Sequence, residues 1–180
     1  MPLQLTDYTQ LANYNKIVVT GPQRSGTRIT TKIIAHDFGC KMVDEMRLKI
    51  SSLQKFSEVM LEPNKMAIHC PALSSIVHLI DFPNTVVVFC FRDFNDIKKS
   101  QERIGWKHDT IERAKYFVDD TDPREQFEVK YHCWNIFQKP KMRVDFFENH
   151  YSSLSNHRLW INKELRSNFH ICQTELKEKR

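Results

Sequence analysis

The chain has 180 residues, 41% hydrophobic and 27% charged, a composition typical of a folded globular domain and not of a disordered or collagen-like chain. Its net charge of +5 suits an anionic ligand, but the basic residues are scattered among acidic ones, so no nucleic-acid-binding arm is expected. We find no signal-peptide pattern and no apolar run of membrane-spanning length, and therefore expect a soluble, cytoplasmic protein without a membrane partner.

Apolar runs alternate with helical patterns along the chain. Strands are expected at residues 16–20, 66–69, 85–91 and 142–147, and helices at 26–38, 72–81, 94–104 and 124–138. Gly39 is the expected stop of the first helix, Asp93 the cap of the third and Asp122-Pro123 the start of the fourth. This alternation predicts an α/β fold with three layers, α/β/α, and a parallel central sheet. We expect a single domain over residues 1–180, with flexible ends at about 1–14 and 174–180.

A glycine-bracketed loop joins the first strand to the first helix. Such a loop directs backbone N–H groups and the positive end of a helix dipole at an anion. Gly21 and Gly26 have the separation found in the Walker loop, Gly-x-x-x-x-Gly-Lys-Ser/Thr. We therefore expect a fold like that of P-loop nucleoside triphosphate hydrolases. Thr27 stands in the lysine position, however, and Arg28 in the position of the hydroxyl that holds magnesium. We therefore expect a compact anionic group, bound without a metal by backbone amides and by Arg24, Ser25, Thr27 and Arg28.

The cysteines do not indicate a metal site or a disulfide framework. Five cysteines are widely spaced and no Cys-x-x-Cys pair occurs among them. Reduced thiols in the core are the expectation, at Cys40, Cys70, Cys90, Cys133 and Cys172.

Two motifs resemble the sulfotransferase family that uses 3′-phosphoadenosine 5′-phosphosulfate (PAPS). The family's loop for the 5′-phosphosulfate carries a basic residue followed by Ser-Gly-Thr, as Arg24-Ser25-Gly26-Thr27 does here. Its second signature is an arginine at the end of an apolar strand with a serine eight positions later, and the two hold the 3′-phosphate. Arg92 follows the strand at 85–91, and Ser100 follows Arg92 at that spacing. The resemblance implies PAPS as the donor, adenosine 3′,5′-bisphosphate (PAP) as the product, and no metal.

The same resemblance implies a general base. The family's catalytic histidine lies in a His-x-Pro turn, which His69-Cys70-Pro71 matches, so His69 is the leading candidate. Glu45 is the rival, because some protein-tyrosine sulfotransferases place a glutamate base about twenty residues beyond the loop arginine, here Arg24. With the late strand that begins at Met142, the similarity spans roughly residues 16–155. No tryptophan follows the loop to stack on adenine, so no adenine-binding residue is assigned.

The implied reaction is in-line transfer of a sulfuryl group from PAPS to an acceptor hydroxyl or amine. His69 would take the acceptor proton, and Arg24 with the loop amides would stabilise the departing oxygen. The acceptor could be a small molecule, a glycan or a protein.

Other interpretations stay open. The chain could be a P-loop small-molecule kinase, which would need magnesium and a nucleoside triphosphate, or a catalytically silent nucleotide- or RNA-binding module. Single residues also have structural interpretations: Arg92 could pair with Asp93 or Asp96, and His69 could be a packed core histidine.

Overall fold

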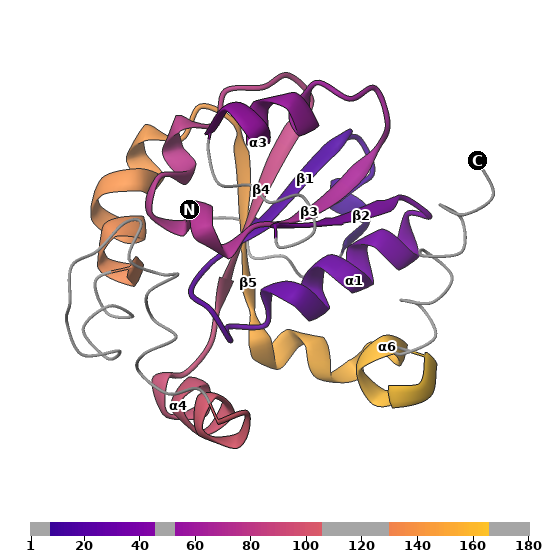
Figure 1. Cartoon of the computed structure of the whole chain (residues 1–180), viewed down its shortest axis with the longest axis vertical. Helices are drawn as coiled ribbons and strands as arrows, with labels where there is room; N and C mark the ends of the chain where they lie inside the picture. Colours follow the sequence, from indigo (N-terminus) through magenta and orange to yellow (C-terminus); the bar gives the residue numbers. More distant parts are fainter. Residues whose placement is uncertain (1–7, 46–52, 106–129, 166–180) are drawn as a thin grey trace.

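The computed structural model of the protein describes residues 8–45, 53–105 and 130–165. Within these ranges five strands form one sheet in the order β2-β3-β1-β4-β5, and every pairing is parallel (Figure 1). The strands are β1 (Lys16–Thr20), β2 (Lys41–Asp44), β3 (Met66–His69), β4 (Thr85–Phe91) and β5 (Asp145–His150). The expected α/β fold with a parallel sheet is thus confirmed.

Helices flank the sheet. The α-helices are α1 (Thr27–Asp37), α3 (Leu53–Met60), α4 (Phe94–Arg103) and α6 (Arg158–Ile161). Short 3-10 helices occupy Tyr8–Leu11, Pro71–Ser75, Val77–Leu79, Lys139–Lys141 and Tyr151–Asn156, and a π-helix spans Cys133–Gln138. None of the helices in the described ranges is long and apolar enough to cross a membrane.

The sheet buries both of its faces. Every residue of β1 is buried, as expected for a central strand of a parallel sheet. Because side chains alternate along a strand, Val18 packs into the core under α3 and the π-helix, whereas Val19 packs into the other core, under α1. Leu11, within the expected flexible end at about 1–14, is fully buried in that second core.

Several boundaries expected from sequence are confirmed. Strands β1, β3 and β4 have the expected limits, α1 lies within residues 26–38, and α4 lies within 94–104. Gly39 follows the end of α1 with a φ of +57°, in the left-handed region that glycine favours after a helix. Asp93 caps α4, since its Oδ1 accepts hydrogen bonds from the backbone N–H groups of Asn95 and Asp96.

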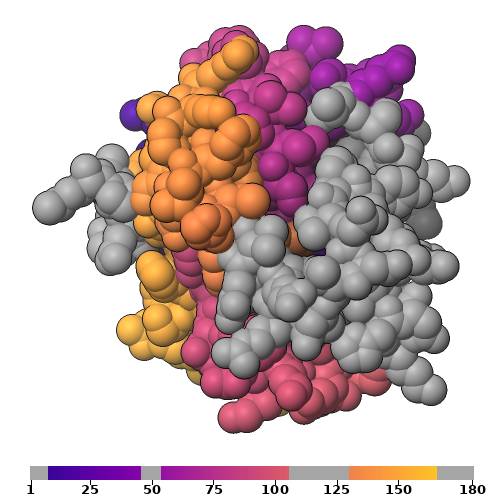
Figure 2. Space-filling model, turned by 90° about the vertical axis from the view of Figure 1, so that its left-hand side faces the viewer, coloured from indigo at the N-terminus to yellow at the C-terminus, as the bar shows by residue number. Residues whose placement is uncertain are grey.

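The helix expected at residues 72–81 is wrong, because this segment forms two short 3-10 helices. The buried Gln138 explains the interruption: its Nε2 donates to Ser74 O at 2.8 Å, and its Oε1 accepts from Val77 N at 3.1 Å. One side chain therefore satisfies backbone groups that a regular helix would pair internally. Figure 2 shows the π-helix segment (orange) lying against this part of the chain (magenta).

Other differences concern β2, α3 and the end of the sheet. Neither β2 nor α3 was expected, and β5 begins at Asp145 instead of residue 142. The apolar side chains of Met142 and Val144 pack on the core without joining the strand, which explains the early expected start. Of the helix expected at 124–138, residues 124–129 and its start signal at Asp122-Pro123 lie outside the described residues.

Candidate anion-binding site

The loop after β1 needs glycine at both of its ends. A Cβ atom on Gly21, where φ is +135°, would lie 2.7 Å from the backbone oxygen of Cys90 in β4. A Cβ atom on Gly26, where φ is +97°, would lie 2.6 Å from the Tyr151 ring. Because Gly26 also precedes the first residue of α1, the loop runs closely between neighbouring segments and ends at a helix N-terminus.

The loop meets α4 through Arg24, which contacts Ser100 within that helix. The Arg24 backbone is left-handed, with a φ of +69°, and its side chain donates to Ser100 Oγ from both Nε (3.1 Å) and Nη2 (2.9 Å). Burial, together with the positive charges of Arg103 and Arg92, lowers the pKa of the Arg24 guanidinium. Arg24 therefore lies near several other positive charges, a pattern that a bound anion would stabilise.

Arg92 follows β4 and reaches the same loop. Its Nη1 donates to the backbone oxygen of Arg24 at 3.0 Å, and its guanidinium carbon lies 3.8 Å from the centre of the Tyr151 ring. The Tyr131 hydroxyl accepts from the Arg92 backbone N–H at 2.8 Å. The end of β4 is thus held by Tyr131 and by Arg24, and the Arg92 guanidinium is turned toward the loop that joins β1 to α1.

Two buried polar atoms at this place have no hydrogen-bond partner among the described residues. They are Arg92 Nε, a donor, and Ser25 Oγ, a hydroxyl on a side chain that is 1% exposed. Buried polar groups are normally paired, so unpaired donors beside a helix N-terminus fit a site for an anion.

A second cluster lies beside the first turn of α1. His69 ends β3 and pairs in register with Asp44 at the end of β2, which brings their side chains together. His69 Nε2 lies 3.0 Å from Thr27 Oγ1, and His69 Nδ1 lies 3.3 Å from Asp44 Oδ2. Arg28 Nη2 donates to the same Asp44 oxygen at 2.7 Å.

The Asp44 carboxyl is strongly biased toward its ionised form. Burial alone would raise its pKa, but the His69 ring and the Arg28 guanidinium outweigh this effect and hold the pKa well below its usual range. The side chains of Asp44 and His69 are each 9% exposed, whereas that of Arg28 is 56% exposed. Asp44, His69 and Thr27 thus form a nearly buried row that ends at the first residue of α1, beside the loop that follows β1.

Glu45, the rival base, has a different environment. Its Oε2 accepts a hydrogen bond from the backbone N–H of Ala72 at 3.0 Å, at the start of the 3-10 helix after β3. Burial and the nearby Glu45 charge raise the pKa of the Cys70 thiol. The described contacts of Glu45 are therefore with the segment that follows β3, which begins at Cys70, directly after His69.

The expected site residues lie in two neighbouring groups. Arg24, Arg92 and Ser100 lie together, and Thr27, Arg28 and His69 lie together, while Gly21, Ser25 and Gly26 shape the loop between them. Asp44 is the residue that sequence reasoning missed, because the strand that carries it was not expected. The short apolar pair Met42-Val43 after the helix stop at Gly39 was the available signal.

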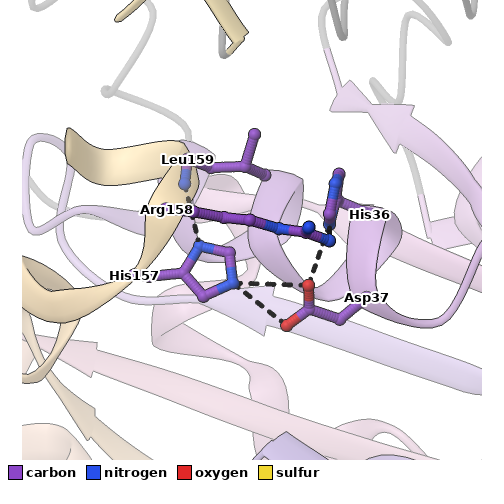
Figure 3. A network of polar contacts seen from close by, with 5 residues as sticks. All are labelled: His36, Asp37, His157, Arg158 and Leu159. Atoms are coloured by element: carbon purple, nitrogen blue, oxygen red, sulfur yellow. Dashed lines mark hydrogen bonds and ion pairs between the residues drawn. The ribbon is translucent and has the colours of Figure 1, made fainter. Parts of the chain in front are cut away.

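A similar histidine–aspartate contact occurs at the opposite end of α1 (Figure 3). Asp37 Oδ2 lies 3.1 Å from His157 Nε2, and Asp37 Oδ1 lies 2.9 Å from His36 Nδ1. The His157 Nδ1 accepts the backbone N–H of Leu159 at 3.2 Å. This contact fastens the start of α6 to α1, about 15 Å along the helix from the loop.

Within residues 8–45, 53–105 and 130–165, no group of three His, Cys, Asp or Glu side chains is placed to hold a metal ion. Among the described cysteines, Cys70, Cys90 and Cys133 are free thiols and Cys40 is buried, whereas Cys172 lies outside the described residues.

Comparison with known proteins adds no functional assignment. No protein-family model and no curated protein matches the chain. The chain is similar to the crystal structure of an uncharacterized protein from Eubacterium ventriosum ATCC 27560, with 16% sequence identity and a TM-score of 0.44. The match covers 75% of this chain and 88% of that chain, and it carries no argument about activity.

Proposed function

We propose that the protein is a sulfotransferase that takes a sulfuryl group from PAPS, on a three-layer fold of the P-loop type. One observation carries the proposal: the loop residue Arg24 donates twice to Ser100, and Arg92 donates to the Arg24 backbone oxygen. The two motifs that resemble the donor-binding motifs of sulfotransferases are thus in direct contact, although they lie more than 60 residues apart in sequence. A nucleotide with anionic groups on both its 3′ and 5′ positions matches such a paired basic site.

Donor binding would exchange neutral partners for charged ones. Arg24 now donates to a neutral hydroxyl and Arg92 to a backbone carbonyl. Phosphate or sulfate oxygens would give the same guanidinium groups charge-assisted hydrogen bonds, which are shorter and stronger. Ser25 Oγ and Arg92 Nε supply further polar groups that have no partner in the described structure.

We propose that these groups carry out the transfer step as follows. The acceptor oxygen attacks sulfur while the bond between sulfur and the bridging phosphate oxygen breaks, and PAP leaves with that oxygen. The acceptor proton passes to His69 Nε2, and Arg24 with the N–H groups at the start of α1 stabilises the charge that develops on the leaving oxygen. The Walker-type magnesium hydroxyl is replaced by Arg28, whose guanidinium pairs with Asp44.

Calorimetric titration of the purified protein with PAP, with ATP and with RNA, each with and without magnesium, tests the proposal. We expect PAP to bind without magnesium, and Arg92→Ala to weaken PAP binding at least about tenfold through loss of a charge-assisted contact. Arg143→Ala is the matched control, because Arg143 forms an exposed pair with Asp81. ATP binding that requires magnesium and exceeds PAP binding would favour a kinase, and RNA binding in place of both nucleotides would favour a silent module.

Transfer of labelled sulfur from PAPS to a panel of hydroxyl and amine acceptors tests catalysis directly. We expect Arg24→Ala to lower turnover by about two to three orders of magnitude while the thermal unfolding transition is retained. An Arg92→Ala variant with unchanged PAP affinity would remove the 3′-phosphate assignment.

A further inference from the structure

We propose that Asp44 is a positioning residue that keeps the neutral His69 ring protonated on Nδ1. The Nε2 atom, which faces Thr27 at the start of α1, is then left as the proton acceptor. The catalytic consequence rests on the proposed function, but the assignment of the proton itself does not. The inference starts from the row Asp44, His69 and Thr27, which links the ends of β2 and β3 to the first residue of α1.

The Nδ1 side of the ring decides the location of the proton. Nδ1 is buried, has no aligned hydrogen bond among the described residues, and lies 3.3 Å from Asp44 Oδ2. A lone pair on Nδ1 would face a negative oxygen across that distance, whereas an N–H group would be attracted to it. The arrangement therefore favours the proton on Nδ1.

Arg28 keeps the carboxylate in place and charged. Its Nη2 lies 2.7 Å from the same Asp44 oxygen, and this contact helps to hold the pKa of Asp44 well below its usual range. Because Asp44 stays ionised at neutral pH, it can accept a hydrogen bond from Nδ1 but cannot donate one to it. The carboxylate acts as a fixed negative partner, as in other sites where an acid orients a histidine.

The opposite nitrogen faces the loop. His69 Nε2 lies 3.0 Å from Thr27 Oγ1, and an unprotonated Nε2 accepts the threonine hydroxyl proton in a hydrogen bond. An acceptor hydroxyl that reaches this place meets the same lone pair, so its proton can pass to Nε2 as the new oxygen–sulfur bond forms. The resulting imidazolium carries a positive charge that the Asp44 carboxylate balances.

The decisive measurement is the histidine tautomer in the unliganded, ¹⁵N-labelled wild-type protein. Long-range proton–nitrogen correlation spectra at about pH 8, where histidine is ordinarily neutral, distinguish the two tautomers. The His69 signals are assigned by their loss in His69→Gln. We expect the Nδ1–H form; a His69 ring in the Nε2–H form would overturn the inference, and this result needs no Asp44 variant.

Two aspartate variants extend the test. Asp44→Asn should shift the His69 tautomer population toward Nε2–H, because the amide can donate to Nδ1. Asp37→Asn is the matched control, since Asp37 contacts His36 and His157 in the same manner but lies at the far end of α1 (Figure 3). It should alter the signals of those two histidines and leave His69 unchanged. An Asp44→Asn protein with an unaltered His69 tautomer would contradict the proposed role.

Activity separates this inference from the proposed function. In the sulfur-transfer assay, Asp44→Asn should lower turnover at least about tenfold with little change in PAP affinity, because it acts through the base and not through the donor. A wild-type protein with the Nδ1–H tautomer and no transfer activity would contradict the proposed function and leave the positioning role intact. An active protein with the Nε2–H tautomer would contradict the positioning role and leave the proposed function intact.

Discussion

At the scale of single residues, the loop after β1 is defined by two glycines that no other residue replaces easily. Gly21 lies against backbone atoms of β4, whereas Gly26 lies against the ring of Tyr151, which itself packs on Arg92 and Trp160. Arg24, between them, holds a left-handed conformation without being glycine. Such a conformation is disfavoured for arginine, and its contacts with Ser100 and Arg92 hold it in place.

We expect Gly21→Ala to lower the free energy of unfolding by at least about 2 kcal/mol. The new methyl group would combine a φ of +135° with a 2.7 Å approach to Cys90 O, which is backbone and cannot turn aside. Gly39→Ala is the control, because its φ is +57° but no atom lies within 4 Å of the added Cβ, so a loss of only about 1 kcal/mol is expected. Urea denaturation of both variants gives the comparison, and equal losses would show that the close approach to β4 is unimportant.

At the scale of elements, Gln138 joins two irregular segments on one face of the sheet. It is fully buried at the end of the π-helix and bonds to the backbone of both 3-10 helices after β3. These helices follow His69 directly, so the same contact supports the segment from which the candidate base emerges.

Gln138→Leu should cost about 2–4 kcal/mol of stability, because it leaves Ser74 O and Val77 N buried without a partner. Gln54→Leu on the exposed side of α3 is the control and should change stability by less than about 0.5 kcal/mol. Thermal and urea unfolding measure both. A Gln138→Leu protein as stable as the wild type would show that this side chain does not hold the two segments together.

Asp44 links three elements, since it ends β2, faces His69 of β3 and pairs with Arg28 of α1. Its pKa is lower in the folded protein than in the unfolded chain, where an aspartate titrates at about pH 4. The carboxylate therefore contributes stability above about pH 4, and this contribution is lost as the pH falls toward the folded-state pKa.

The difference in unfolding free energy between wild type and Asp44→Asn should accordingly shrink as the pH falls below about 4. Urea titrations above and below this pH measure it. Asp81→Asn is the control, because the Asp81–Arg143 pair is exposed and its effect should be small at every pH. A difference that grows on acidification would have the opposite sign to that required by a lowered pKa.

At the scale of the whole molecule, the sheet order brings separate segments to one edge. Because β1 lies between β3 and β4, the residues that follow these strands, Gly21, Cys70 and Arg92, meet at their carboxyl ends. The cores on the two faces of the sheet hold this edge in place. The N-terminus of α1 follows the loop at this edge, and Ser100 of α4 contacts Arg24 of the loop. A ligand at this edge would thus contact several elements at once.

Binding of PAP should therefore stabilise the entire fold. At a concentration one hundred times its dissociation constant, a ligand that binds only the folded state adds about 2.7 kcal/mol, which corresponds to roughly 5–10 °C in Tm for a domain of this size. Differential scanning fluorimetry checks this, and we expect Arg92→Ala to require a higher PAP concentration for the same shift. The Arg143→Ala protein should respond as the wild type does.

Much of the fold was predictable because its central strands are continuous apolar runs. The strands at residues 16–20, 66–69 and 85–91 are buried on both faces and carry little ambiguity. Strand β2 was not predicted because its first half is exposed or half-buried, and the expected helix at 72–81 failed because Gln138, distant in sequence, takes over part of its backbone bonding. Local patterns do not contain such long-range partners.

For the candidate site, sequence alone determined the chemical groups: a glycine-bracketed loop, Arg24, His69, Arg92 and Ser100 at the ends of expected strands or in the helices after them. Only the tertiary structure decided how they combine, placing Arg24 on Ser100, Arg92 on the loop, and Asp44 behind His69. The physical reason is that residue type and spacing fix what a side chain can donate or accept and where along an element it lies. Its partner is set by strand order and register, which depend on the packing of the whole sheet.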